Sequence, residues 1–171
     1  DSVASRGLGD VYKRQVYSQI GRGDGPVECY NPWDPTFTKS PGTSSSGSGG
    51  AVAASMGLLS MGTDTGGSVR HPAGMCNLVG MKATFGRISR FGVLAPSWRA
   101  DQAGPLTKTV TDCSLAMNVL AGYDPQDLIS INEPTPDYTS FLGGDLKGVR
   151  IGVPTDAWLW EREIEDIEVL V

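Results

Sequence analysis

The apolar positions of the central region fall into short runs that glycine- and serine-rich segments separate. The small residues of 51–56 predict a helix with Ser48 as its cap, and the apolar run 58–61 predicts a buried strand. This strand ends in a tight glycine-containing turn at 62–68. The pattern therefore predicts a loop, a helix, a strand and a turn in close succession.

A second set of elements is predicted after this turn. Pro72 favours a short helix over 69–76, because a proline in the first turn of a helix loses no hydrogen bond. The clearest helix covers 113–121, which an [ST]-x-x-[DE] capping box at 109–112 precedes and Gly122 ends. The other expected elements are a strand at 78–81, a strand or loop at 86–95, a polar loop at 124–138, a strand at 147–154 and an acidic helix after it.

The two ends of the chain differ from this centre. Residues 1–15 show neither helical nor strand periodicity, and we interpret them as a foreign leader. Residues 16–40 are rich in turn formers and predict an extended connection over a surface. The acidic helix at the other end has no stop signal, which predicts that the domain is truncated there.

Composition and charge narrow the class of protein. The chain has 171 residues, 39% of them hydrophobic, with 23 glycines and 11 prolines, which is typical of one loop-rich globular domain. The net charge is -5, and most of it lies in the last eleven positions. Nothing in this distribution resembles the basic footprint of a nucleic-acid-binding domain.

The cysteines and the apolar runs bear on location. The three cysteines, Cys29, Cys76 and Cys113, are far apart and form no C-x-x-C pair, so neither a disulfide scaffold nor a zinc site is expected. No apolar run is long enough for a membrane span, and the first 30 residues show no signal-peptide pattern. The sequence predicts a soluble protein in the reducing cytoplasm that binds no membrane.

The single histidine restricts the chemistry. Any Ser-His-Asp mechanism has to use His71, which lies three residues after Ser68. A nucleophile and its base usually come from separate elements, so we do not expect this local pair to act as one. A serine nucleophile without histidine needs another base, and a desolvated neutral lysine is the usual substitute.

Two serine- and glycine-containing segments are candidates for a site. Gly66, Gly67 and Ser68 allow a sharp turn that exposes a hydroxyl and points backbone N–H groups into one concavity, which suits an oxyanion. The alternative is a β-turn with a capping serine, whereas a phosphate loop is disfavoured because no lysine follows the glycines. The run 44–50 alone would be a flexible linker, but it leads directly into a helix, a strand and the second turn.

These residues resemble the amidase signature family. The resemblance rests on the segments 31–34, 42–48, 62–70, 72–73, 79–80 with Lys82 and Thr84, 86–87, 101–110, 137–138 and 147–154. It implies an α/β fold in which a mixed β-sheet core is flanked by helices. Residues 16–171 would form a partial amidase signature domain that is truncated at both ends.

The resemblance also implies a Ser-cisSer-Lys triad. Ser68 matches the nucleophile, and Ser44 matches the bridging serine that follows a cis peptide bond, with Ser45 as the alternative because Thr43 stands where the family usually has glycine. The lysine lies upstream of this chain in the family. The backbone N–H groups of Thr65, Gly66, Gly67 and Ser68 match the oxyanion hole, and Asp64 and Arg70 match residues that brace the loop.

The implied activity is hydrolysis of a small-molecule carboxylic amide through a seryl acyl-enzyme, without metal or organic cofactor. One alternative is the A subunit of the glutamyl-tRNA(Gln) amidotransferase, a glutaminase that supplies ammonia to a partner subunit. The other alternative is a catalytically inactive scaffold relative. We expect a homodimer or, under the first alternative, amidotransferase partner subunits, and no direct contact with nucleic acid.

Overall fold

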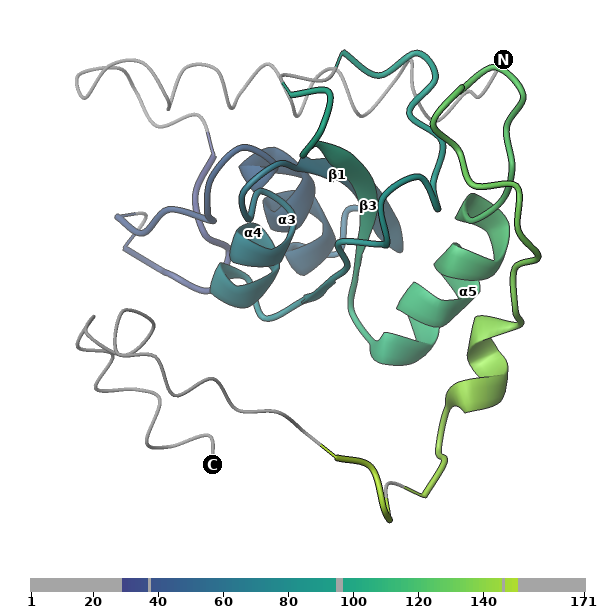
Figure 1. Cartoon of the computed structure of the whole chain (residues 1–171). Coiled ribbons are helices and arrows are strands. Elements are labelled where there is room, and N and C mark those ends of the chain that lie inside the picture. The colour runs from purple at the N-terminus through teal and green to yellow at the C-terminus, as the bar shows by residue number, and fades with distance from the viewer. Residues whose placement is uncertain (1–28, 37, 95–96, 146, 151–171) are drawn as a thin grey trace.

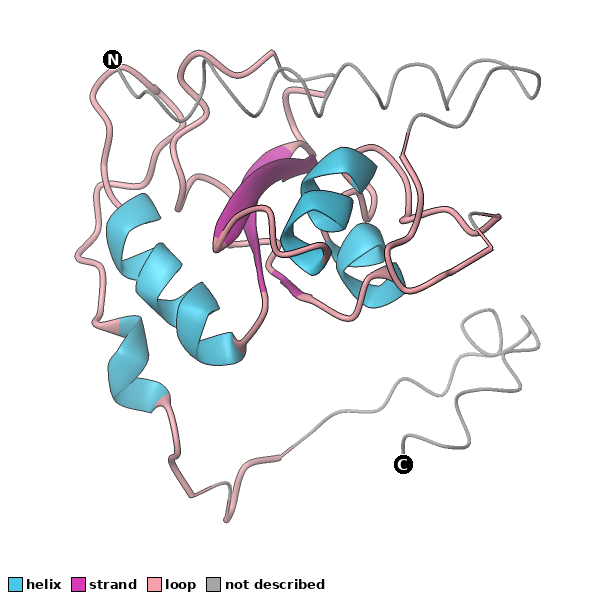
Figure 2. Cartoon of the chain, turned by 180° about the vertical axis from the view of Figure 1, so that it is seen from behind, coloured by secondary structure: helices cyan, strands magenta, loops and turns pink. Residues whose placement is uncertain are grey.

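The computed structural model describes residues 29–36, 38–94, 97–145 and 147–150 (Figure 1). Within them, a small β-sheet separates two groups of helices (Figure 2). Helices α3 and α4 pack together on one side, and α5 packs on the other. In chain order the elements are α3 (Ser46–Ala53), β1 (Leu59–Asp64), α4 (Arg70–Met75), β2 (Val79–Gly80), β3 (Gln102–Thr107), α5 (Val110–Leu120) and the 3-10 helix η1 (Tyr138–Phe141).

The sheet has the strand order β1-β3-β2, and both pairings are antiparallel. Leu59 pairs with Thr107 at one end of β1, and Asp64 pairs with Gln102 at the other end. The α/β class that the resemblance implied is confirmed. The sheet of the described residues is antiparallel throughout, rather than mixed as predicted, because each described strand pairs only with an oppositely directed neighbour.

Strand β3 lies in the centre of the sheet, and the hydrophobic pattern did not predict it. Its sequence contains Gly104 and Pro105, which argue against a central strand because proline cannot donate to the ladder. Pro105 pairs with Met61 of β1, and its carbonyl accepts a hydrogen bond from Met81 on the other side. The missing N–H therefore faces the end of the β2–β3 ladder, whose last pair is Gly80–Leu106. A side chain at Gly104 would collide with the carbonyl oxygen of Met81, so this glycine permits a close approach of two backbones.

Two small apolar clusters hold the helices to the sheet. Val69, Ala73 and Leu106 are buried together between α4 and the sheet. The second cluster lies between α5 and the sheet and contains Ala83, Ile88, Ala103 and Met117. The first cluster connects α4, which follows the turn after β1, to β3, and the second cluster connects α5 to β3.

The predicted helix caps are right at α5 and wrong at α3. Thr109 caps α5, where its hydroxyl oxygen accepts a hydrogen bond from the N–H of Asp112 at 3.0 Å. Helix α3 begins at Ser46, so Ser48 lies inside it, and its hydroxyl donates to the carbonyl of Met61 at 2.9 Å. Ser48 therefore ties α3 to β1 instead of capping the helix.

Two further segments that were predicted as possible strands contain no strand among the described residues. Residues 86–95 form a loop as far as they are described, and only Ile88 makes an isolated bridge, with Ala121. Residues 147–150 are not in a strand, and the remainder of the predicted strand and acidic helix, like the predicted leader 1–15, lies outside the described residues. Among the described residues, none of the helices is both long and apolar enough to cross a membrane.

Candidate active site

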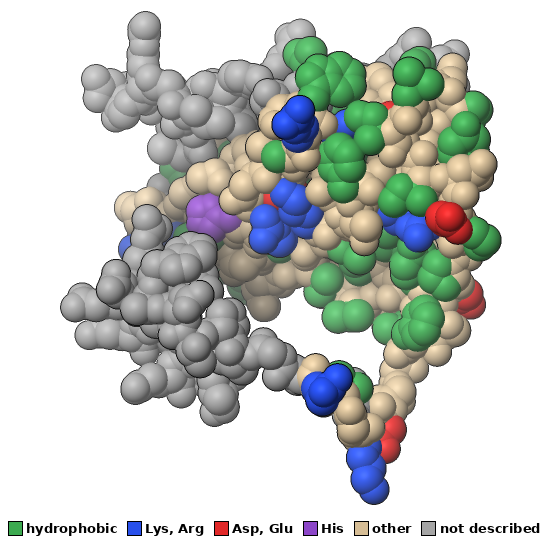
Figure 3. All heavy atoms as spheres, viewed as in Figure 1, with side chains coloured by type: hydrophobic (Ala, Val, Ile, Leu, Met, Phe, Trp, Pro, Cys, Tyr) green, Lys and Arg blue, Asp and Glu red, His purple; other side chains and the backbone are tan. Residues whose placement is uncertain are grey.

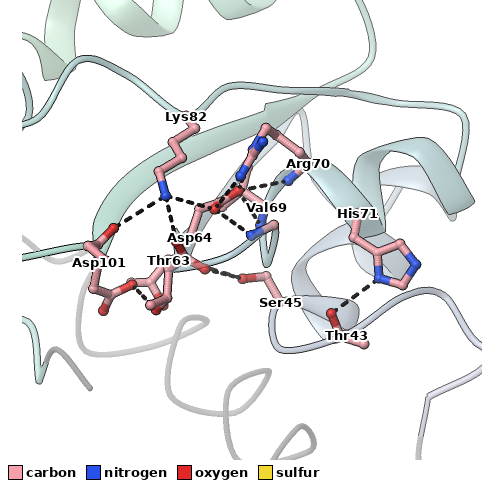
Figure 4. Close-up of polar contacts among 12 residues, drawn as sticks. Thr43, Ser45, Thr63, Asp64, Val69, Arg70, His71, Lys82 and Asp101 are labelled. Atoms are coloured by element: carbon pink, nitrogen blue, oxygen red, sulfur yellow. Dashed lines mark hydrogen bonds and ion pairs between the residues drawn. The ribbon is translucent and has the colours of Figure 1, made fainter. Parts of the chain in front are cut away.

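The candidate site is built around the turn that joins β1 to α4. The last residue of β1, Asp64, is completely buried and points its carboxylate back into the turn (Figure 4). Its oxygens accept hydrogen bonds from the backbone N–H groups of Gly67 at 2.8 Å, Val69 at 3.2 Å and Arg70 at 3.2 Å. One carboxylate thus fixes the backbone on both sides of Ser68.

Two cations approach this carboxylate from different sides (Figure 4). Arg70 donates from Nε at 3.0 Å and from Nη2 at 3.1 Å, and the ammonium of Lys82 lies 3.3 Å from Oδ1. Burial by itself raises the pKa of Asp64, but the hydrogen bonds from Arg70 and from the turn outweigh it and hold this pKa well below its ordinary value. Asp64 is therefore a charged support of the turn, and its contact with Arg70 has the geometry of the brace that the resemblance implied.

Three of the four backbone N–H groups predicted for the oxyanion hole have no partner among the described residues, namely those of Thr65, Gly66 and Ser68. The fourth, on Gly67, is used differently from the prediction, because it donates to Asp64. A Cβ atom added at Gly66 or Gly67 would meet nothing within 4 Å. The turn therefore faces open space, where a substrate could approach it.

Ser68 and Ser44 lie at the edge of this space, and both are half-buried. Neither hydroxyl has a hydrogen-bond partner among the described residues, so no hydrogen bond joins the two. The prediction of a cis peptide bond before Ser44 is wrong for this structure, because none of the described peptide bonds is cis. Ser44 instead has a positive φ of 49°, in the left-handed region that non-glycine residues rarely adopt.

Ser45, the alternative to Ser44, is occupied in another way. It is buried, and its hydroxyl donates to the carbonyl of Thr63 at 3.4 Å and accepts from the N–H of Thr63 at 3.2 Å. Its own N–H donates to the carbonyl of Ser68 at 3.3 Å. Ser45 thus anchors the serine-rich loop to β1 and to the turn, which leaves Ser44 as the bridging candidate.

His71 does not face Ser68. Its Nδ1 lies 3.2 Å from the hydroxyl of Thr43, and its backbone N–H donates to the carbonyl of Gly67. The expectation that Ser68 and His71 form no local pair agrees with this arrangement. Instead, the imidazole links the start of α4 to the residue before Ser44.

The cysteines show no sign of reactivity. Burial raises the pKa of Cys29 and of Cys113, and burial together with the neighbouring Cys29 raises the pKa of Cys76 to about 11. All three are free thiols. Because the thiolate is the nucleophilic form, these cysteines are packing residues rather than candidates for catalysis.

A layer of polar residues that supports the turn is not predicted by the sequence pattern. The hydroxyl of Thr65 donates to Asp101 at 3.0 Å, and the buried Arg90 donates to the carbonyl of Asp101 at 2.8 Å. Lys82 was noted only as a residue that the resemblance includes. The available signal was Asp101, a polar residue directly before the strand that pairs with β1 at Asp64. Using this signal required knowledge of β3, which the hydrophobic pattern does not predict.

Comparison with known proteins decides the family. The family model described as Amidase matches residues 22–169, which is most of the chain. The chain belongs to the amidase family. In curated proteins, it is 52% identical over 126 residues to the A subunit of the glutamyl-tRNA(Gln) amidotransferase of Geobacter sp. (strain M21), a match that covers 74% of this chain and 26% of that protein.

Solved structures show the same likeness for this amidase-family chain. The A subunit of the glutamyl-tRNA(Gln) amidotransferase from Thermotoga maritima superposes with a TM-score of 0.59 at 46% identity, covering 61% of this chain and 23% of the other. Native peptide amidase from Stenotrophomonas maltophilia superposes with a TM-score of 0.60 at 38% identity, covering 65% and 23%. The chain thus spans about a quarter of the length of the relatives it matches.

Proposed function

We propose that the full-length protein hydrolyses a carboxylic amide through an ester on Ser68. The observation that supports this most is the turn after β1. Asp64 holds the backbone before and after Ser68, while the N–H groups of Gly66 and Ser68 remain without a partner among the described residues, next to open space. A fixed, unpaired set of N–H donors beside a free hydroxyl suits an acyl-transfer reaction.

In the proposed reaction, Oγ of Ser68 attacks the amide carbon and loses its proton through Ser44 to the lysine that the resemblance places upstream of this chain. The carbonyl oxygen becomes an oxyanion that the N–H groups of Thr65, Gly66 and Ser68 stabilise. The C–N bond then breaks, and the amine leaves with the transferred proton. Water hydrolyses the resulting ester by the same steps in reverse, which regenerates Ser68.

Two substrate classes fit this chemistry. A free amidase would act on a simple amide without partner subunits, and one of the similar solved structures carries the name peptide amidase. The second candidate is the A subunit of the glutamyl-tRNA(Gln) amidotransferase, and the identity of 52% to a curated protein of that name favours it. Under this second candidate the amide is that of glutamine, and ammonia passes to partner subunits.

A labelling experiment on the full-length protein tests the nucleophile. A fluorophosphonate should attach to Ser68, and Ser68→Ala should abolish this label and reduce amide hydrolysis by several orders of magnitude. Ser114→Ala is the matched control, because Ser114 lies on α5 and only donates to the carbonyl of Val110. A label that persists in Ser68→Ala would refute the assignment, and a wild-type protein with neither label nor activity would favour an inactive scaffold.

The two substrate classes are separated by the same full-length protein. Hydrolysis of simple amides without partner subunits would support the free amidase. Hydrolysis of glutamine alone, and only after partner subunits are added, would support the amidotransferase.

A further inference from the structure

Lys82 occupies an unusual place relative to the candidate oxyanion hole. It follows β2, and the N–H of the preceding residue, Met81, donates to the carbonyl of Pro105 in β3 at 3.1 Å. The side chain of Lys82 then extends to the far edge of β3, where β1 ends at Asp64 (Figure 4). Its ammonium group therefore lies beside the first residues of the turn that carries Ser68.

Three acceptors surround this ammonium group. The carbonyl oxygen of Thr65 lies 2.7 Å from Nζ, and the carbonyl oxygen of Ala100 and Oδ1 of Asp64 each lie at 3.3 Å. A lysine ammonium has three N–H bonds and no acceptor. It donates hydrogen bonds to the two carbonyls, and the carboxylate is its ion-pair partner. The shortest of the three contacts is to a carbonyl of the turn itself.

The contact between Lys82 and the carbonyl of Thr65 also orients the next N–H group of the turn. In a planar trans peptide the C=O and the N–H point in opposite directions, so fixing the carbonyl of Thr65 also fixes the N–H of Gly66. That N–H points away from Lys82 and has no partner among the described residues. A positive charge at the oxygen end also polarises the peptide and makes its N–H a stronger donor.

The second cation of the site does not duplicate this role. Arg70 contacts the same carboxylate, but its side chain is about half exposed and donates to Asp64 rather than to a carbonyl of the turn. Among the described lysines and arginines, only Lys82 contacts the carbonyl of Thr65.

We propose that Lys82 is a positioning residue for the oxyanion hole. Its ammonium group holds the Thr65–Gly66 peptide so that the N–H of Gly66 faces the carbonyl oxygen of the bound amide. This inference rests on the proposed function. Lys82 is not the base of the reaction, because its ammonium group donates to the carbonyls of Thr65 and Ala100, pairs with the carboxylate of Asp64 and makes no hydrogen bond to Ser44 or Ser68.

The test compares Lys82→Met with Lys108→Met in the full-length protein. Lys108 is exposed and contacts Ser55, so it offers the same chemical change away from the turn. Lys82→Met should lower kcat by about 100-fold at a KM within about twofold of wild type, because an oxyanion donor acts mainly in the transition state. Labelling of Ser68 by a fluorophosphonate should slow similarly, and Lys108→Met should change neither rate.

Melting temperature separates positioning from support. A purely structural role predicts that Lys82→Met lowers the melting temperature while the folded enzyme keeps its kcat, and that result would overturn the proposal. A rise in KM at unchanged kcat would overturn it as well. If the wild-type protein neither hydrolyses amides nor labels at Ser68, the proposed function itself fails.

Lys82→Arg keeps the test available if the methionine variant does not fold. It retains the positive charge beside Asp64, but a guanidinium nitrogen has at most two N–H bonds and cannot serve three acceptors as an ammonium does. The proposal expects a folded enzyme with kcat reduced about tenfold at unchanged KM. A kcat equal to that of wild type would overturn it.

Discussion

The turn after β1 and the groove beside α5 lie at opposite ends of β1. The turn is polar and its carboxylate is fully hydrogen-bonded, whereas the groove is apolar and exposed. At the turn, one buried carboxylate is saturated by N–H groups and two cations. The groove, of about 530 Å³, lies between the start of β1 and α5, where Leu58 is 90% exposed and Val119 84% exposed. Figure 3 shows such hydrophobic side chains along the side of the molecule that α5 forms.

The two regions differ in how far the described residues supply their contacts. The polar contacts of the turn come from Ser45 and from residues 64–82 and 100–101, all of them described. The groove has apolar walls but no cover from the described residues. Hydrogen bonds among the described residues therefore fix the turn, whereas these residues leave the apolar groove beside α5 uncovered.

Asp64→Asn is expected to give the largest effect and would break the turn. Asparagine leaves the positive charges of Arg70 and Lys82 without their carboxylate. Because Arg70 is about half exposed and only Asp64 is fully buried, this loss should cost about 1–3 kcal/mol. Thermal unfolding of the full-length protein should show this loss, together with a large fall in kcat. A variant with wild-type stability would show that the network around Asp64 contributes little.

The acid dependence of stability gives a second test of the same network. The pKa of Asp64 is lower in the folded protein than in the unfolded chain, so its contribution is present above about pH 4 and is lost as the pH falls further. The difference in melting temperature between wild type and Asp64→Asn should therefore shrink below pH 4. A difference that stays constant down to pH 2 would contradict the depressed pKa.

Thr109→Ala should have a smaller effect, at the other end of the comparison. It removes the cap of α5, which costs about 1 kcal/mol. Because α5 lies away from the turn, the loss should appear in denaturant unfolding but not in the KM of the full-length enzyme. A change in KM would show that the groove and the turn are coupled.

Substitutions in the groove are expected to change stability least. In the 171-residue chain, Leu58→Lys and Val119→Lys remove exposed apolar surface, so they should reduce binding of an apolar dye and self-association while shifting stability by no more than about 0.5 kcal/mol. Thr111→Lys, an exposed polar position on the same helix, is the charge-matched control. Equal dye binding by all variants would show that the groove is not the exposed apolar surface.

The sequence predicted the local features of the fold better than the pairing between them. The capping box at Thr109 and the tight turn before Ser68 are encoded in neighbouring residues, and both were predicted. Strand β3 is not predicted because Gly104 and Pro105 are turn formers, and the close approach of Met81 that explains Gly104 is visible only in the folded sheet. Ser48 was taken for a cap, because its partner, the carbonyl of Met61, is identified only once α3 lies against β1.

In the candidate site, too, local features are predicted better than contacts between distant residues. The resemblance identified Asp64, Arg70 and the turn, which lie in one continuous segment. The use of the Gly67 N–H by Asp64 and the contact of Lys82 with Thr65 depend on the three-dimensional arrangement of β1, β2 and β3. No single-sequence pattern specifies such contacts, because they join residues from different strands.

The most direct measurement is to trap the acyl-enzyme. The full-length protein is mixed with an amide or ester substrate, quenched in acid within the first turnover and digested, and the modified peptide is identified by mass spectrometry. The account predicts an acyl group on Ser68. An acyl group on Ser44, Ser45 or any other residue, or hydrolysis with no acylated peptide at any quench time, would contradict it.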